Sequence, residues 1–139
     1  MIMKGFGILT RLIHTRVFGY SPKNKFTDEE FACRCGCGLK GINTGTLERL
    51  NSARYMATIP FKINSGIRCS KHNLSVSKVG LNSPHLGGFA VDISAVHSRE
   101  RFIILISLLL SGFTRIGIGS TFIHADDDPS KVEEVIWTY

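Results

Sequence analysis

Residues 83–92 read Ser-Pro-His-Leu-Gly-Gly-Phe-Ala-Val-Asp, and this stretch predicts a tight loop that runs directly into a strand. The paired glycines Gly87 and Gly88 mark the turn, and residues 89–93 have the apolar, β-branched character of a strand. Strand alternation places the side chain of Asp92 opposite those of its two apolar neighbours. Because a buried carboxylate is costly without a partner, Asp92 predicts an ion pair, a capping hydrogen bond or a metal ion here.

A second strand, predicted over residues 122–126, carries another pair of polar residues. His124 and Asp126 share one face of this strand, so two strands each offer polar side chains from an apolar frame. Together, His85, Asp92 and His124 would make a three-ligand site with an open fourth position. That arrangement is used by catalytic zinc, on which a water molecule becomes a nucleophile near neutral pH. The alternatives are structural histidines and an Asp92 that forms a cap or a salt bridge.

The rest of the chain divides into helical and strand-like segments. Apolar residues at spacings of three and four predict a helix over residues 44–57, and a second helix is expected from Ser98 to about residue 111. Residues 65–83 are polar and rich in glycine, which predicts a loop with a helical turn near residues 70–74. Further strands are expected at residues 61–64, 115–118 and 135–139. Strands segregated from helices predict an α+β fold, with a small antiparallel sheet and helices packed on one side.

Length and composition predict an ordinary globular chain. The 139 residues are 43% hydrophobic and 20% charged, which fits one domain over residues 26–139 after an N-terminal arm, residues 1–25. The most apolar run, residues 102–110, is too short to cross a membrane, for which about 20 residues are needed. Residues 1–19 lack the continuous apolar run and cleavage site of a signal peptide. We therefore predict no membrane span and synthesis in the cytoplasm.

The net charge of +6 predicts an anionic partner, either a nucleic acid or an anionic polymer such as a bacterial wall. The basic residues are scattered without a run of four, and no nucleic-acid-binding motif is present. We therefore predict that nucleic acid is not the partner.

The four cysteines are unevenly placed, with Cys33, Cys35 and Cys37 close together and Cys69 far from them. Three states stay open: reduced and inert thiols, a disulfide that includes Cys69, or a structural metal site. The C-x-C-x-C spacing differs from the usual C-x-x-C zinc knuckle. Cys33, Cys35 and Cys37 lie on a glycine-rich loop with no histidine within six residues, and a zinc-activated water needs no thiol. We therefore predict that none of the four cysteines is catalytic.

Several segments of the chain together resemble one family. Residues 83–92 match the S-x-H-x-x-G-x-A-x-D signature of the zinc D-Ala-D-Ala carboxypeptidases and L-alanyl-D-glutamate endopeptidases, a group that includes VanY-like enzymes, phage endolysins and the hedgehog-type fold. Residues 65–69 look like its S-G-[YF]-R segment, and residues 123–126 look like its closing H-x-D segment. Residues 26–38 resemble the opening of its short cell-wall branch.

This resemblance implies specific roles for the site residues. His85, Asp92 and His124 match the zinc ligands, which implies one Zn2+ per chain. Arg68 matches the arginine that binds a substrate carboxylate, which suits the planar fork of a guanidinium, and Ser83 matches a residue of the same substrate pocket. The implied activity is hydrolysis of peptidoglycan stem peptides by a monomer, as a carboxypeptidase or an endopeptidase. Small size without a recognised signal peptide further favours a phage lysis or tail-associated enzyme that acts on the cell wall.

The chain departs from the family pattern at the catalytic base. Many members carry Glu or Asp three residues before the last zinc ligand, and here that position is Thr121, which cannot accept a proton. Asp126 is the nearest carboxylate on the same strand face, so we predict it as the base, with a hydrogen bond that orients a ligand histidine as the alternative role. The missing carboxylate also leaves open a weak or inactive zinc-containing binding module on the same fold.

Overall fold

The computed structural model describes residues 21–139, so most of the predicted N-terminal arm, residues 1–20, lies outside the described residues. Where the described chain begins, the backbone N–H of Lys25 donates to the side chain of Asn51. The helices are α2 (Thr44–Ala57), α3 (Ser70–Val76) and α4 (Ser98–Leu110), with 3-10 turns η1 (Asp28–Phe31), η2 (Gly80–Asn82) and η3 (Pro84–Gly87). The strands are β1 (Ile63–Ser65), β2 (Ala90–Ser94), β3 (Arg115–Ile118), β4 (Phe122–Asp126) and β5 (Val135–Thr138).

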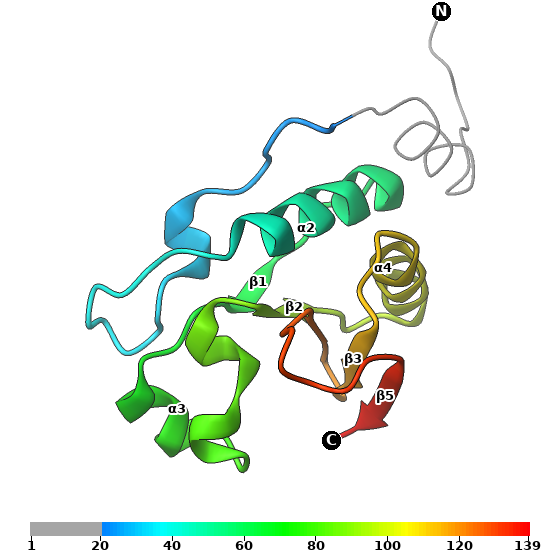
Figure 1. Cartoon of the computed structure of the whole chain (residues 1–139). Coiled ribbons are helices and arrows are strands. Elements are labelled where there is room, and N and C mark those ends of the chain that lie inside the picture. The colour runs from blue at the N-terminus through cyan, green and yellow to red at the C-terminus, as the bar shows by residue number, and fades with distance from the viewer. Residues whose placement is uncertain (1–20) are drawn as a thin grey trace, which may run out of the picture.

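These elements form an α+β fold, as predicted, around one sheet with the strand order β1-β2-β4-β3-β5 (Figure 1). The prediction of an antiparallel sheet is correct for three pairings and wrong for the fourth, because β5 runs parallel to β3. The path of the chain explains this. Arg115 pairs with both Asp126 and Val135, so the chain leaves β4 and starts β5 at the same end of β3. The direction of β5 is therefore opposite to that of β4. Because β3 is also antiparallel to β4, β5 is parallel to β3.

The two longer helices cover one face of the sheet, which agrees with the prediction. Leu50 of α2 and Ile104 of α4 pack in one buried cluster with residues from four strands. The strand residues of this cluster are Ile63, Val91, Ile93, Ile116, Ile123 and Ala125. Alternation along β2 and β4 therefore turns the residues between these apolar ones toward the opposite face.

Local signals fix the ends of α2. The side chain of Asn43 accepts hydrogen bonds from the backbone N–H groups of Gly45 and Thr46, which satisfies two donors of the first turn. The helix ends at Ala57, where Thr58 takes a left-handed conformation with φ of 57°. The observed helix has the bounds that the sequence predicts.

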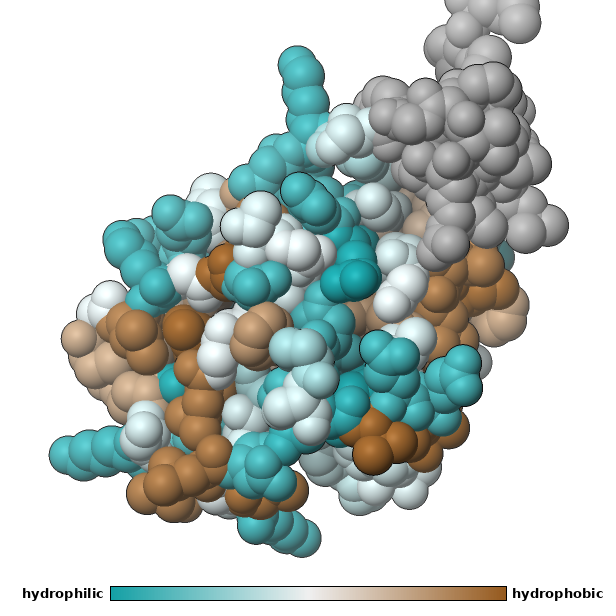
Figure 2. Space-filling model, viewed as in Figure 1, coloured by the Kyte–Doolittle hydropathy of each residue, from teal (hydrophilic) through white to brown (hydrophobic). Residues whose placement is uncertain are grey.

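The α3 end of the molecule carries exposed apolar side chains, which Figure 2 shows gathered over this region. They are Leu74, Val76, Val79 and Leu81. Across residues 21–139, no helix combines the length and the apolar character that crossing a membrane requires.

Candidate metal centre

Two of the predicted ligands meet because their strands pair in register. Asp92 of β2 lies directly opposite His124 of β4 in the antiparallel ladder, and both side chains are buried on the sheet face that α2 and α4 leave uncovered. Residues directly opposed in such a pair have closely spaced side chains. The strand register therefore brings together two groups that are 32 residues apart in the sequence.

The third predicted ligand, His85, comes from the 3-10 turn η3 that precedes β2. The Ser83 side chain caps this turn by accepting a hydrogen bond from the backbone N–H of His85. Gly88 ends the turn with φ of 72°, a left-handed conformation that favours glycine. The turn thus delivers His85, which is 3% exposed, to the polar face of the sheet.

The loop before α3 fixes the orientation of the His85 ring. His85 Nδ1 lies 2.6 Å from the carbonyl oxygen of Gly66, so Nδ1 carries the proton and Nε2 keeps its lone pair for a ligand. Gly66 must be a glycine here, because a Cβ atom would lie 2.6 Å from backbone atoms of Phe31. The close approach of these two segments therefore sets which nitrogen of His85 can bind a metal.

Three donor atoms converge on one point in this arrangement. Asp92 Oδ1 lies 2.9 Å from His124 Nδ1 and 3.4 Å from His85 Nε2, and the three atoms all lie within 4.8 Å of one another. Bonds of about 2.0–2.1 Å to a tetrahedral zinc ion place nitrogen and oxygen ligands at about this separation. The donor set and its spacing fit zinc, and the three residues leave the fourth position for a non-protein ligand.

The electrostatics of the three groups are coupled. Burial raises the pKa of Asp92, but the hydrogen bonds from His124 and His85 outweigh it and hold the pKa below its ordinary value of 3.8. Burial lowers the pKa of His124, yet its hydrogen bonds to Asp126 and Asp92 raise the pKa above 6.5 overall. The two carboxylates beside His124 thus favour its positively charged form, and the two histidines favour the charged form of Asp92.

Asp126, the predicted base, lies on the far side of the His124 ring. Its Oδ2 is 2.8 Å from His124 Nε2, and its Oδ1 accepts hydrogen bonds from Arg115 and from the backbone N–H of Asp128. The side chain is fully buried. Both carboxylate oxygens are therefore occupied, and the bond to Nε2 leaves His124 Nδ1 to face Asp92. These contacts favour the alternative role, orientation of a ligand histidine, over that of a base.

Arg68, the predicted binder of a substrate carboxylate, reaches the edge of this centre. Its guanidinium donates to Asp92 Oδ2 at 2.8 Å, to Ser65 Oγ at 2.9 Å and to Asn73 Oδ1 at 3.3 Å. A guanidinium carries five N–H groups, so among residues 21–139 these bonds leave two for other acceptors. The side chain is 13% exposed and lies beside the three converging donors.

The other sequence-predicted positions have structural contacts here. Ser83 is buried and its hydroxyl accepts the hydrogen bond that caps η3, so its contact in the described residues is with the turn that carries His85. Thr121 is exposed, and its carbonyl oxygen accepts a hydrogen bond from the backbone N–H of Ala95. The family pattern has a carboxylate at this position, and Thr121 does not provide one.

Four residues outside the predicted set of site residues surround the centre. Asn73, fully buried, holds Arg68, while Arg115 holds Asp126 and lies over the Trp137 ring. The Trp137 ring centroid lies 5.4 Å from that of His124, and the Tyr139 ring follows at 6.4 Å from Trp137. Two-residue alternation along β3 and β5 is the signal that could have placed Arg115, Trp137 and Tyr139 on this face. No local pattern marks Asn73.

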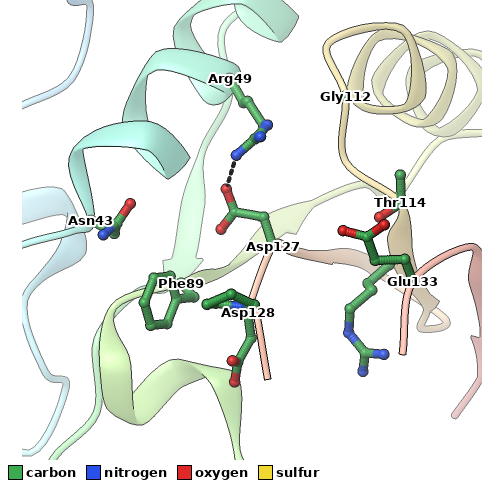
Figure 3. Close-up of a pocket in the computed structure, with 10 residues that line it drawn as sticks. Asn43, Arg49, Phe89, Gly112, Thr114, Asp127, Asp128 and Glu133 are labelled. Atoms are coloured by element: carbon green, nitrogen blue, oxygen red, sulfur yellow. Dashed lines mark hydrogen bonds and ion pairs between the residues drawn. The ribbon is translucent and has the colours of Figure 1, made fainter. Parts of the chain in front are cut away.

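A separate pocket of about 320 Å³ is lined in part by the residues that follow β4 (Figure 3). It is lined by residues 127–129 together with side chains that include Asn43, Arg49 and Phe89, and it contains none of the three predicted ligands. Asp127 accepts hydrogen bonds of 2.5 Å from both Thr46 and Arg49, so it ties the end of β4 to the start of α2. The acidic stretch that follows Asp126 is thus anchored to α2 through Asp127.

Comparison with known proteins adds an independent finding. The family model described as Peptidase M15 matches residues 24–126, most of the chain. This range contains all six predicted site residues, from Arg68 to Asp126, and ends with β4. No curated protein gives a significant match to the chain.

Proposed function

Because this chain belongs to the peptidase M15 family, a family of zinc-dependent peptidases, we propose that it cleaves the stem peptides of peptidoglycan. The observation that carries the proposal is the convergence of His85 Nε2, Asp92 Oδ1 and His124 Nδ1 on one point. Each histidine directs its second nitrogen to a fixed partner, Gly66 or Asp126, which is typical of metal ligands. Zinc bound there would supply Lewis acidity and a nucleophile at neutral pH.

The other predicted site residues would bind the substrate or hold the ligand histidines in position. The two unused N–H groups of Arg68 suit a carboxylate of the substrate, and stem peptides of the wall carry such groups. Arg68 lies against Asp92, so a carboxylate bound there would be held close to the scissile bond. Asp126 keeps His124 in the orientation that presents Nδ1. Ser83 keeps His85 in place through the cap of η3.

The proposed place of action is the cell wall, for a monomer that serves in phage lysis or in a tail-associated role. The net charge of +6 supports this assignment, because a positively charged chain is attracted to an anionic polymer.

The alternative is a zinc-containing binding module that does not hydrolyse its ligand. One observation favours it: both oxygens of Asp126 are bonded, so the carboxylate predicted as the base is engaged elsewhere. Binding of wall peptides through Arg68 would need no base.

Incubation of zinc-saturated protein with purified peptidoglycan tests the proposal. Mass spectrometry of the soluble products should show free D-alanine from a carboxypeptidase, or shortened stems and released peptides from an endopeptidase. The His124→Ala variant should release neither, because it lacks one of three ligands, whereas Ser70→Ala, at an exposed position, should match the wild type. Wild-type protein that co-sediments with peptidoglycan and releases no product would favour the binding module.

A further inference from the structure

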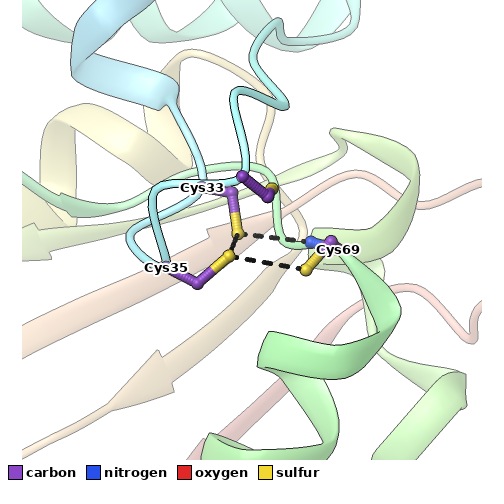
Figure 4. A group of neighbouring side chains, drawn as sticks. Cys33, Cys35 and Cys69 are labelled. Carbon is purple, nitrogen blue, oxygen red and sulfur yellow. Dashed lines mark hydrogen bonds between the residues drawn. The ribbon is translucent and has the colours of Figure 1, made fainter.

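The four cysteines, two of them buried or half-buried and two exposed, gather at one point although the sequence separates them (Figure 4). Cys33, Cys35 and Cys37 come from the loop after η1, and Cys69 is the residue before α3. The Sγ atom of Cys35 lies 3.5 Å from that of Cys33 and 3.7 Å from that of Cys69. All four Sγ atoms lie within 4.8 Å of one another, and all four cysteines are free thiols.

We propose that these cysteines form a second metal site, a structural Zn2+ bound by four thiolates. In a tetrahedral site with Zn–S bonds of about 2.3 Å, the sulfur atoms are about 3.8 Å apart. The two Sγ–Sγ separations from Cys35, 3.5 and 3.7 Å, are close to that value. Disulfides bring sulfur atoms together in pairs, whereas here each of four sulfurs is near all the others, as round a single ion.

The backbone of the loop explains how C-x-C-x-C can serve as a three-ligand motif. In an extended strand, alternate side chains share a face but lie about 7 Å apart, too far for one ion. Here Gly36 and Gly38 adopt φ of 80° and 84°, left-handed conformations that curl the chain between and after the cysteines. The backbone N–H of Cys33 donates to the carbonyl of Leu39 and closes the loop. The curl therefore gathers sulfurs that a strand would spread.

Backbone donors also point at the sulfurs. The N–H of Cys69 lies 3.4 Å from Cys33 Sγ, and the N–H of His72 lies 3.4 Å from Cys69 Sγ. Such outer hydrogen bonds stabilise the negative charge of coordinating ligands. With four cysteine ligands a zinc ion has no open position, so the site is structural, as in other closed centres built from four thiolates.

This site would fix the position of residues 66–68, which contact the first metal centre. Residues 66–68, which precede Cys69, supply the Gly66 carbonyl that orients His85 and the guanidinium that pairs with Asp92. The N–H of Ile67 also donates to the carbonyl of Phe31 at 3.0 Å. Cys33 and Cys69 are 36 residues apart in the sequence. A metal bound by both would therefore fix the position of residues 66–68 relative to the cysteine loop.

Metal analysis of the purified protein separates the two sites. We expect two zinc ions per wild-type chain, one in His85→Ala and one in the double variant Cys35→Ser/Cys37→Ser, which changes only exposed cysteines. The triple combination should hold none, and Ser70→Ala, next to Cys69, should keep both. Zinc K-edge absorption of His85→Ala should show only sulfur neighbours at about 2.3 Å, because the cysteine site alone remains.

Three outcomes would overturn the proposal. They are a wild-type zinc content that the double cysteine variant does not lower, iron in place of zinc, and disulfides found when the denatured chain is alkylated without a reductant. If the double variant does not fold, the wild type still decides the question. Titration with a mercurial should release one zinc as four thiols react, and release of no zinc by thiol modification would contradict the four-thiolate site. A failure of peptidase activity leaves all these readouts unchanged.

Discussion

Asp126 Oδ2 lies 2.8 Å from His124 Nε2, so the carboxylate binds the ring nitrogen that faces away from the converging donors. On the other side of the same ring, Nδ1 lies 2.9 Å from Asp92 Oδ1. One imidazole thus lies between two carboxylates, of which one belongs to the proposed metal site and the other holds the ring. This relationship makes Asp126 the most informative residue to change.

The Asp126→Asn variant should weaken zinc binding roughly tenfold to a hundredfold, as is usual when the partner of a ligand histidine is altered. Turnover of the zinc-saturated variant should stay near that of the wild type, because the amide still hydrogen-bonds the ring. Zinc affinity is measured by competition with a chelator, and turnover with wall peptides. A drop in turnover of about a hundredfold at full zinc occupancy would instead identify Asp126 as the base.

Replacement of Arg68 by Ala should lower kcat/KM for wall peptides by more than about tenfold, because a charge-assisted bidentate contact is lost. Arg68→Lys should restore only part of this, since an ammonium lacks the planar fork. A substrate whose carboxylate is converted to an amide provides the control. If Arg68 binds that group, the amide should be a poor substrate for the wild type, and Arg68→Ala should reduce its turnover little further. Equal losses on both substrates would contradict carboxylate binding.

Gly66→Ala should destabilise the fold by about 2 kcal/mol or more, because the new Cβ would lie 2.6 Å from the backbone of Phe31 and force the two segments apart. Zinc binding by His85 should weaken as well, since the Gly66 carbonyl orients its ring. Gly45→Ala is the matched control: it lies in the first turn of α2, where the nearest atom to a new Cβ is Asn43 Oδ1 at 3.4 Å, so the free energy of unfolding should change by less than about 1 kcal/mol. Thermal denaturation of both variants measures the contrast.

The stability of the metal-free protein should depend on pH through these buried pairs. The pKa of His124 is raised above 6.5 in the fold, so its contribution is complete below pH 6.5 and is lost as the pH rises through the raised value. The pKa values of Asp92 and Asp126 are lowered below 3.8, so their contributions are complete above pH 3.8 and are lost as the pH falls through the lowered values. Melting temperatures of chelator-treated protein should therefore be highest between pH 3.8 and 6.5.

The same protonation competes with zinc. Zinc affinity should rise with pH until His124 has lost its proton, which happens above pH 6.5 because the folded-state pKa is raised. Asp126→Asn removes the first of the hydrogen bonds that raise this pKa, so the rise in affinity should move to lower pH. An unchanged midpoint in this variant would show that Asp126 does not set the protonation of His124.

Local patterns in the sequence predicted the pieces of this protein. The period of apolar residues predicted the bounds of α2, and the strands predicted at residues 115–118 and 122–126 have the observed limits of β3 and β4. Alternation also placed Asp92 and His124 on polar strand faces, because the side-chain period of two depends only on local backbone geometry. The fold class and the candidate ligands follow from the spacing of apolar residues in helices and strands, together with the loop motif at residues 83–92.

Only the tertiary structure decided which groups meet. The direction of β5 depends on where the chain returns to the sheet after residues 127–134. The spacing of apolar residues along the sequence does not predict that path. Alternation placed Asp126 beside His124 but could not tell which ring nitrogen it faces, and that choice separates a base from a positioning residue. The approach of Cys69 to Cys33 is likewise a contact between distant segments, set by the packing of residues 66–68 against η1. Local sequence determines backbone form, whereas the contacts that make a metal site arise only when the chain is packed.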